Sequence, residues 1–265
     1  MEASHSGLVR RPGKSVWVTP PRVRISPPPP IFKRKNRVET SNVSTGTFCD
    51  VEIMKIKKIG HCCLVVEEGG ARFLTDPGNF SDTPDEANIH AILITHEHQD
   101  HLHIPALKSI LENNPEAVVI THGDVGKILS KENIEFQIIE DGGEAEIKGV
   151  SVKSFGTEHA CIHKDFPVVR NTGFMIAGRL FYPGDSLHEP NTKVEILALP
   201  VAGPWVKIGE AVDYAVKVKP EVVFPVHDGM LRPERVGSTR RVPAAVLEPL
   251  NIRFVDIVEG TEVEF

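Results

Sequence analysis

Apolar and polar positions follow a regular pattern from residue 54 to the end of the chain. Short apolar or alternating segments are separated by turns that contain Gly, Asp or Pro. Segments of this kind are typical of strands, whereas apolar residues spaced i, i+3, i+4 and i+7 indicate helices. Strands are predicted over 55–59, 62–67, 71–75, 91–95, 117–121, 136–140, 144–147, 150–155, 172–177, 179–182, 196–199 and 221–226, and helices over 104–114, 124–132 and 208–216. A run of strands followed by alternating strands and helices indicates an α/β protein whose sheets are covered by helices.

Residues 1–53 show no sustained apolar periodicity. They hold 7 of the 21 prolines, and 9 Lys/Arg against 4 Asp/Glu, a net charge of +5. This composition cannot bury enough apolar surface to fold, so we expect residues 1–53 to be disordered and dispensable. They lack the apolar stretch of a secretory signal. A basic arm that binds nucleic acid or a membrane is one interpretation; we favour the other, that the start is assigned too early and Met54 begins the protein.

Charge and composition restrict the function of the remaining chain. Residues 54–265 carry 21 of the 30 Lys/Arg and 32 of the 36 Asp/Glu, a net charge of −11, which argues against a generally basic nucleic-acid binder. No run of 18 apolar residues occurs, so no membrane-spanning helix is predicted. The four cysteines show no framework spacing, and neighbours such as Cys62 and Cys63 would point to opposite faces of a strand. Reduced thiols in a cytoplasmic protein are expected.

The densest group of metal-binding side chains follows the strand predicted over 91–95. His96, His98, Asp100 and His101 fall within six residues, where the chain turns from a strand into a helix. Imidazole nitrogens and carboxylate oxygens are the ligands that zinc and similar divalent ions accept. Solvated loop residues are the plain alternative. Four such side chains directly after an apolar strand favour a metal site.

Further candidate ligands follow other predicted strands. His159 comes after the strand 150–155, Asp185 after a strand that ends at Tyr182, and His227 after a strand that ends at Val226. Functional loops of α/β sheets collect at the carboxyl ends of strands, so we expect these side chains to meet. His163, four residues after His159, is an alternative to it.

The order of these residues resembles the metallo-β-lactamase superfamily, whose signature is H-x-H-x-D-H followed by His, Asp and His. The resemblance covers nearly all of residues 54–265. The segments 60–64, 75–78, 182–185 and 224–227 look like the L-ascorbate-6-phosphate-lactonase-like branch. The resemblance implies an αββα four-layer sandwich with a two-metal centre at one edge.

The resemblance also implies which residues hold the metal. The ligand sets would be His96, His98 and His159 for one ion and Asp100, His101 and His227 for the other, with Asp185 bridging both. Zn²⁺ is expected, and a set of nitrogen and oxygen ligands also accepts Mn²⁺ or Fe²⁺. Two such ions share a water and lower its pKa towards ~7, which gives a hydroxide nucleophile at neutral pH. Asp100 would orient this hydroxide and later transfer a proton.

Residues around the centre are expected to have supporting roles. Asp76, at a Pro-Gly turn, is expected to support the metal site. His61 is expected either to support the site or contact substrate, or to have a purely structural role. Trp205 is expected to line the substrate pocket or to pack in the core. The basic residues near the C-terminus are expected to lie on a solvated face: Arg232, Arg235, Arg240 and Arg241.

The sequence therefore predicts a metal-dependent hydrolase of a small ester, lactone or phosphoester. The first alternative is a nucleic-acid phosphodiesterase of the same superfamily. Such enzymes usually carry an exosite arm or an inserted domain, and a Gly soon after the last histidine of the motif; here His101 is followed by Leu-His-Ile-Pro. The second alternative, a non-catalytic metal-binding or scaffolding protein, is disfavoured because all seven ligands are present. We expect a small-molecule partner, no membrane and no nucleic acid. No feature of the sequence indicates an oligomeric state.

Overall fold

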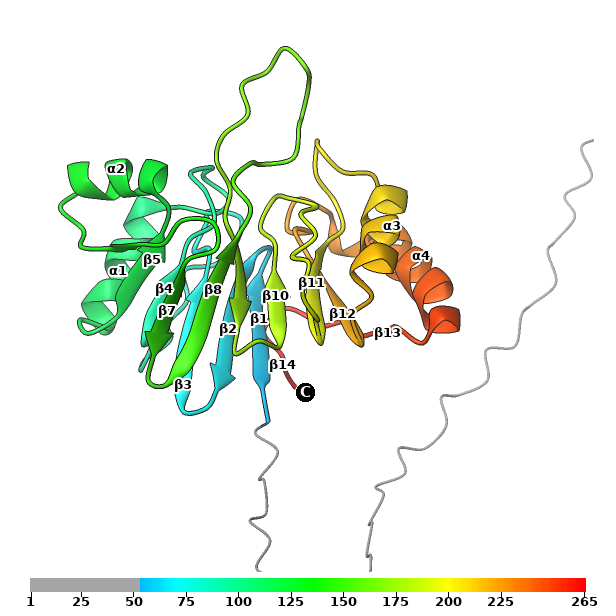
Figure 1. Ribbon diagram of the computed structural model, residues 1–265, viewed down its shortest axis with the longest axis horizontal. Coiled ribbons are helices and arrows are strands. Elements are labelled where there is room, and N and C mark those ends of the chain that lie inside the picture. Colours follow the sequence, from blue (N-terminus) through cyan, green and yellow to red (C-terminus); the bar gives the residue numbers. More distant parts are fainter. Residues whose placement is uncertain (1–52) are drawn as a thin grey trace, which may run out of the picture. The chain divides into compact units, whose positions relative to one another are not determined.

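Two mixed seven-stranded sheets form the centre of the structure, a computed structural model that describes residues 53–265 (Figure 1). The order of one sheet is β14-β1-β2-β3-β4-β5-β6 and that of the other is β13-β12-β11-β10-β9-β8-β7. In the first sheet β3 to β6 are parallel neighbours, and in the second β10 to β13 are; the other neighbours are antiparallel. The predicted disorder of residues 1–53 falls almost wholly on residues outside the described part.

The bounds of the elements follow the apolar segments closely. The first sheet consists of β1 (Lys55–Gly60), β2 (Cys63–Glu68), β3 (Ala71–Thr75), β4 (Ala91–Leu93), β5 (Val118–Thr121), β6 (Gln137–Ile138) and β14 (Glu262–Glu264). The second consists of β7 (Glu144–Ile147), β8 (Val150–Phe155), β9 (Gly173–Ile176), β10 (Leu180–Tyr182), β11 (Ile196–Pro200), β12 (Val222–Val226) and β13 (Arg253–Phe254). The α-helices are α1 (Ile104–Asn113), α2 (Gly123–Lys131), α3 (Ile208–Val218) and α4 (Gly237–Leu247), and short 3₁₀ turns cover Pro233–Arg235 and Glu248–Leu250.

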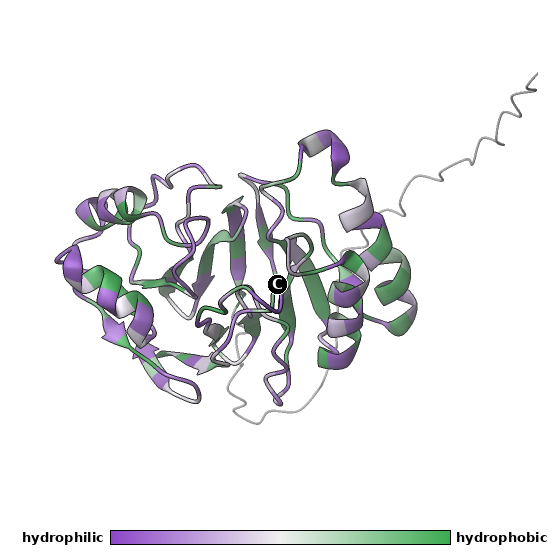
Figure 2. Ribbon diagram, turned by 90° about the horizontal axis from the view of Figure 1, so that it is seen from above, coloured by the Kyte–Doolittle hydropathy of each residue, from purple (hydrophilic) through white to green (hydrophobic). Residues whose placement is uncertain are grey.

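Three apolar layers hold these elements together. Side chains such as Phe73 and Phe174 fill the space between the two sheets. Leu107 of α1 packs in a second layer on the outer face of the first sheet, and Ala215 of α3 in a third on the outer face of the second sheet. Figure 2 shows apolar residues on the strands and mixed polar and apolar residues on the outer helices. The predicted αββα sandwich is confirmed. Among the described helices, none has the length and apolar character needed to cross a bilayer.

Some elements differ from the sequence prediction at their ends. The strand predicted over 91–95 ends at Leu93, and the backbone N–H of Thr95 donates to Asp76 Oδ1 at 2.8 Å instead of to a neighbouring strand. The strand predicted over 136–140 is reduced to the two residues of β6. Helix α4 was not predicted, because it contains Pro243 and buries only three of its eleven residues, a pattern with little apolar periodicity.

The expectation that the C-terminal basic residues lie on a solvated face is wrong for Arg240, which lies on α4. Its side chain is only 17% exposed, and its guanidinium lies 2.6 Å from Asp228 Oδ2 and 2.6 Å from Asp256 Oδ1. Asp228 also accepts hydrogen bonds on both oxygens from Lys58 Nζ, at 2.7 and 2.8 Å, and the Lys58 side chain is 1% exposed. Lys58, Asp228 and Arg240 form a charge cluster with little exposure, here called the Asp228 clamp, and the exposed Asp256 lies at its edge. The other three arginines of the run are exposed, as expected.

Candidate metal centre

The candidate ligands lie where strands that run in the same direction end. Strands β1, β3 and β4 share one direction in the first sheet, and β8, β10 and β12 share one direction in the second. The polar residues that follow these six strands are His61, Asp76, the 96–101 cluster, His159, Asp185 and His227. Three of them have a positive backbone φ although they are not glycine: His61 (42°), Asp76 (35°) and His227 (59°).

Asp185 lies at the centre of the converging side chains and is 2% exposed. Its Oδ1 lies 3.0 Å from His101 Nε2, and its Oδ2 lies 2.9 Å from His227 Nε2 and 3.2 Å from His159 Nε2. None of these three nitrogens, nor Asp185 Oδ1, makes a hydrogen bond of acceptable geometry. Buried polar atoms are rarely left without a partner. A group of such donor atoms at this separation fits a metal ion that they would share.

The other ring nitrogens of these histidines have partners that set their orientation. Nδ1 of His159 and Nδ1 of His227 each lie 2.6 Å from a backbone carbonyl oxygen. Nδ1 of His101 lies 2.7 Å from Asp76 Oδ2. Because these acceptors bind the proton on Nδ1, the neutral form of each ring has its lone pair on Nε2, which points to the common centre. The residues present therefore fit a metal.

One set of four donors consists of His96, His98, His159 and Asp185, whose ligand atoms all lie within 4.8 Å of one another. His96 Nε2 and His98 Nδ1 are 3.0 Å apart. His98 is partly exposed, and the other three are buried. The alternative residue His163 has a side chain that is 64% exposed. The structure thus brings His159, and not His163, into the group.

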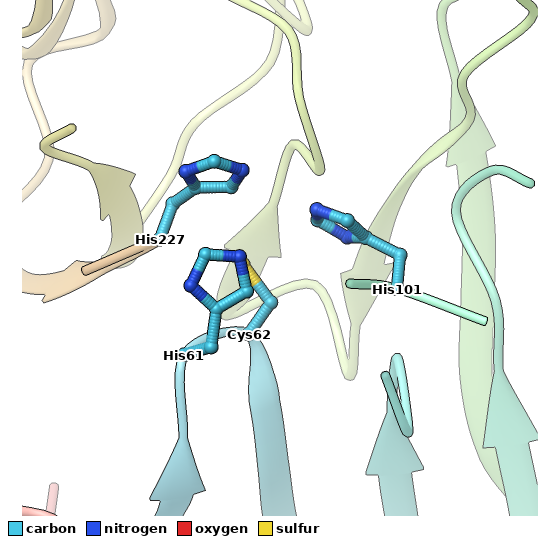
Figure 3. A group of neighbouring side chains, drawn as sticks. All are labelled: His61, Cys62, His101 and His227. Atoms are coloured by element: carbon cyan, nitrogen blue, oxygen red, sulfur yellow. The ribbon is translucent and has the colours of Figure 1, made fainter. Parts of the chain in front are cut away.

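A second set of four donors consists of His61, Cys62, His101 and His227, whose side chains point toward one another (Figure 3). Asp100 adjoins this set, with its Oδ2 at 3.8 Å from His101 Nε2 and 3.7 Å from His227 Nε2. All seven residues predicted as ligands therefore lie at one site. Asp100 has a side chain that is 20% exposed and lies on the open side of the group.

Cys62 is the residue of this site that sequence reasoning missed. It precedes β2 and is buried in the layer between the sheets, whereas its neighbour Cys63 is buried in the layer under α1 and α2. The alternation along the strand places residue 62 on the same face as Leu64, and this was the available signal. Burial raises the pKa of the Cys62 thiol well above its usual range, so it is protonated.

The charges of the site suit a cation. Burial opposes ionisation of Asp185, but the neighbouring imidazoles of His101 and His227 hold its pKa well below the usual range. Burial also opposes ionisation of Asp100, but a hydrogen bond from His61 and the neighbouring His101 lower its pKa to about 2. Burial lowers the pKa of His96 well below its usual value. Both carboxylates are therefore ionised and His96 is neutral, the forms in which these groups bind metal. Burial opposes protonation of His101, but the carboxylates of Asp185 and Asp76 raise its pKa well above its usual value, so His101 would release a proton from Nε2 on binding a metal.

Asp76 lies directly after β3 and contacts the candidate site through hydrogen bonds. Its Oδ1 accepts the backbone N–H of Thr95, and its Oδ2 accepts the Thr95 hydroxyl and the Nδ1–H of His101, each at 2.7 Å. The hydroxyl of Tyr182 also donates to Oδ2. Asp76 thus fixes both the start of the 96–101 cluster and the ring of His101; that it supports a bound metal in this way stays a prediction.

Trp205 packs in the core and also contacts the site. It is 8% exposed and belongs to the apolar layer between the second sheet and its helices. Its indole Nε1–H donates to Asp185 Oδ2 at 2.8 Å. Its ring lies edge-on to His159 and His227, with centroids 5.7 and 5.5 Å away. Trp205 thus packs in the core, and its indole contacts the candidate ligand Asp185; a place in the substrate pocket stays a prediction.

Comparison with known proteins gives a consistent result. Residues 55–227 match the family model of the beta-lactamase superfamily domain. Protein Rv0786c of Mycobacterium tuberculosis is 36% identical over 190 residues, 69% of this chain and 88% of the relative. A UPF0173 protein of Pyrococcus furiosus is 30% identical over 188 residues, 66% of this chain and 84% of the relative. A UPF0173 metal-dependent hydrolase of Carboxydothermus hydrogenoformans is 29% identical and covers 66% of this chain and 84% of its own length.

Solved structures share the fold. Igni18, a metallo hydrolase from Ignicoccus hospitalis, has a TM-score of 0.63 at 19% identity, covering 80% of this chain and 98% of its own. YhfI from Bacillus subtilis, a metallo-beta-lactamase fold protein, has a TM-score of 0.62 at 16% identity, covering 81% and 100%. The two-sheet sandwich with histidines and aspartates at one edge is a metallo-β-lactamase fold. The chain belongs to the metallo-β-lactamase superfamily and, within it, to the UPF0173 family of metal-dependent hydrolases.

Proposed function

We propose that this protein hydrolyses a small ester, lactone or phosphoester and that it does so with two divalent metal ions. The observation that carries the proposal is the group of buried donor atoms at Asp185. Three imidazole nitrogens and a carboxylate oxygen lie there without hydrogen-bond partners, although each ring is oriented from its other side. No ordinary core polar cluster leaves so many groups unpaired.

The residues would divide between two ions, with Asp185 available to both. His96, His98 and His159 would hold one, and His101, His227 and Asp100 the other. We propose Zn²⁺, because imidazole and carboxylate ligands suit it, with Mn²⁺ or Fe²⁺ as alternatives that the same donors accept. When bound, such ions supply Lewis acidity and lower the pKa of a coordinated water.

Asp100 is the side chain best placed to move a proton. It is ionised, and it lies on the open side of the site with 20% of its side chain exposed. An ionised carboxylate at this position orients a water through a hydrogen bond and accepts a proton as the reaction proceeds. Trp205 and Asp76, both buried, contact Asp185 and His101 instead.

A small substrate is supported by the composition of the domain. The described residues are used by the two sheets, their four α-helices and the connections between them, the longest of which is residues 156–172 between β8 and β9 (Figure 1), and they include no inserted domain. The net charge of −11 over residues 54–265 opposes a polyanionic substrate.

The segments 60–64, 75–78, 182–185 and 224–227 support membership of the L-ascorbate-6-phosphate-lactonase-like branch. The free thiols of Cys62, Cys63 and Cys161 support the cytoplasm as its compartment.

Two histidines of the β8–β9 loop give a matched test. The His159→Ala and His163→Ala variants remove the same side chain four residues apart, one buried at the site and one exposed. The metal content of each protein, purified without added metal, is measured by mass spectrometry. We expect two ions per chain in the unsubstituted protein and in His163→Ala, and a loss of metal in His159→Ala.

The substrate class is tested on the same preparations. The probes are p-nitrophenyl acetate, γ-butyrolactone, bis(p-nitrophenyl) phosphate and a single-stranded RNA oligonucleotide. Turnover of one of the first three that is lost in His159→Ala and kept in His163→Ala supports the proposal. Preference for RNA would replace it with the phosphodiesterase function. A metal-loaded protein that turns over none of the four would favour the scaffolding function.

A further inference from the structure

His61 lies among the candidate ligands, although the predicted signature does not include it. It follows β1, is completely buried, and its ring centroid is 4.2 Å from that of His227 and 5.6 Å from that of His101. Its donor atoms are close enough to those of its neighbours to share a metal ion with them (Figure 3). Distance alone would therefore make His61 a metal ligand.

The hydrogen bonds of the ring indicate a different role. Nδ1 of His61 lies 3.0 Å from the backbone nitrogen of Gly229, in the geometry of a hydrogen bond that Gly229 donates. A backbone amide can only donate, so Nδ1 must carry its lone pair there. The neutral ring then has its proton on Nε2 and no lone pair on that nitrogen. Nε2 faces Asp100 Oδ2 at 3.3 Å.

We propose that His61 is a positioning residue that donates its Nε2–H to Asp100 and binds no metal. The inference rests on the proposed function, because Asp100 is the group whose orientation His61 would fix. A carboxylate with one oxygen held by a donor has a defined direction for the other, and partners of this kind raise the effectiveness of a reactive group. The role of His61 is thus similar to that of Asp76, except that His61 donates a hydrogen bond to Asp100 whereas Asp76 accepts one from His101.

The surroundings of Gly229 hold this arrangement in place. A Cβ atom at Gly229 would lie 2.9 Å from His61 Cβ and 2.9 Å from the carbonyl oxygen of Phe80, so only glycine allows the approach. The ring of Phe80 packs edge-on against His61 with centroids 5.3 Å apart. Asp228, the preceding residue, is fixed by the clamp with Lys58 and Arg240. The donor to Nδ1 is therefore rigidly placed.

A measurement of the tautomer tests the inference directly. Long-range ¹H–¹⁵N correlation spectra of the full chain, labelled with ¹⁵N-histidine, distinguish protonated from unprotonated ring nitrogens, and the spectrum of His61→Gln identifies the signals of His61. We expect a protonated Nε2 and an unprotonated Nδ1, both in the metal-free and in the zinc-loaded protein. A protonated Nδ1, or an Nε2 signal that moves to that of a zinc ligand on loading, would overturn the proposal.

Two substitutions test the role. In His61→Ala we expect kcat to fall about 10–100-fold, with KM little changed and the ratio of metal to protein unchanged. His61→Gln places an amide N–H near the position of Nε2 and should restore most of kcat. The probe is whichever of the chromogenic esters the unsubstituted protein turns over. Loss of an ion in His61→Ala without restoration in His61→Gln would show that His61 is a ligand.

The two proposals can fail separately. If the unsubstituted protein binds no metal, the proposed function fails, and the tautomer measurement on the metal-free protein still decides the role of His61. If it binds two ions and hydrolyses a probe while His61 shows the signals of a zinc ligand, only the inference about His61 fails.

Discussion

Replacement of Asp228 with Asn tests the energetic weight of the Asp228 clamp. The substitution keeps the shape of the side chain and removes the charge that two cationic groups share. Lys58, 1% exposed, would keep only uncharged acceptors, the carbonyl oxygen of Pro225 at 3.0 Å and the amide oxygen of the new side chain. Removal of one member of a buried ion pair leaves an uncompensated charge and costs about 3–5 kcal/mol. We expect Asp228→Asn to lower the free energy of unfolding by about that amount.

The control uses an ion pair of equal length on the surface. Lys108 Nζ and Glu132 Oε2 are also 2.7 Å apart, but their side chains are 46% and 39% exposed. Glu132→Gln should therefore cost about 0–1 kcal/mol. Urea unfolding of each metal-free protein, monitored by circular dichroism, gives both values with the same slope. If the two variants differ by less than about 1 kcal/mol, burial does not set the energy of the clamp, and the reasoning from exposure is refuted.

Three further predictions concern the site and the pH dependence. Asp100→Asn should lose at least ~10²-fold in turnover with its fold retained; near-normal turnover of the fully metallated variant would exclude Asp100 as the proton acceptor. Asp76→Asn should weaken metal binding about 10–100-fold in a chelator competition, because His101 loses its anionic partner; unchanged affinity would contradict this. Partial burial opposes ionisation of Glu86, but hydrogen bonds from two cationic side chains keep its pKa below 4.5. It therefore stabilises the fold above pH 4.5 and loses this effect as the pH falls, so Glu86→Gln should flatten the acid side of a plot of Tm against pH.

The strongly patterned parts of the fold could be predicted from the sequence. Strands β8 and β10 to β12 have apolar residues at the alternating or continuous positions that half-buried and fully buried strands require. The predicted strand ends also placed His159, Asp185 and His227 at one edge, since strands of one direction bring their carboxyl ends together. For these residues, local pattern and topology agree.

The remaining features depend on contacts that no local pattern encodes. The apolar periodicity of α4 is weak, and the ion pair of Arg240 with Asp228, twelve residues away in sequence, helps to hold the helix in place. The tautomer of His61 depends on Gly229, 168 residues away. A single sequence by itself contains no sign of such pairings.

The positive φ angles at His61, Asp76 and His227 have a consequence for how the family can change over time. Non-glycine residues in this conformation cost of order 1–3 kcal/mol each, and this cost is borne where side chains are needed for function. Glycine would relieve the strain at each of the three positions but would remove a side chain that reaches the centre. While the activity is under selection, the more stable residue is excluded. In a related chain that has lost the activity, selection no longer keeps these side chains. Glycine or asparagine at these three positions would then indicate the loss before any ligand of the H-x-H-x-D-H cluster had changed.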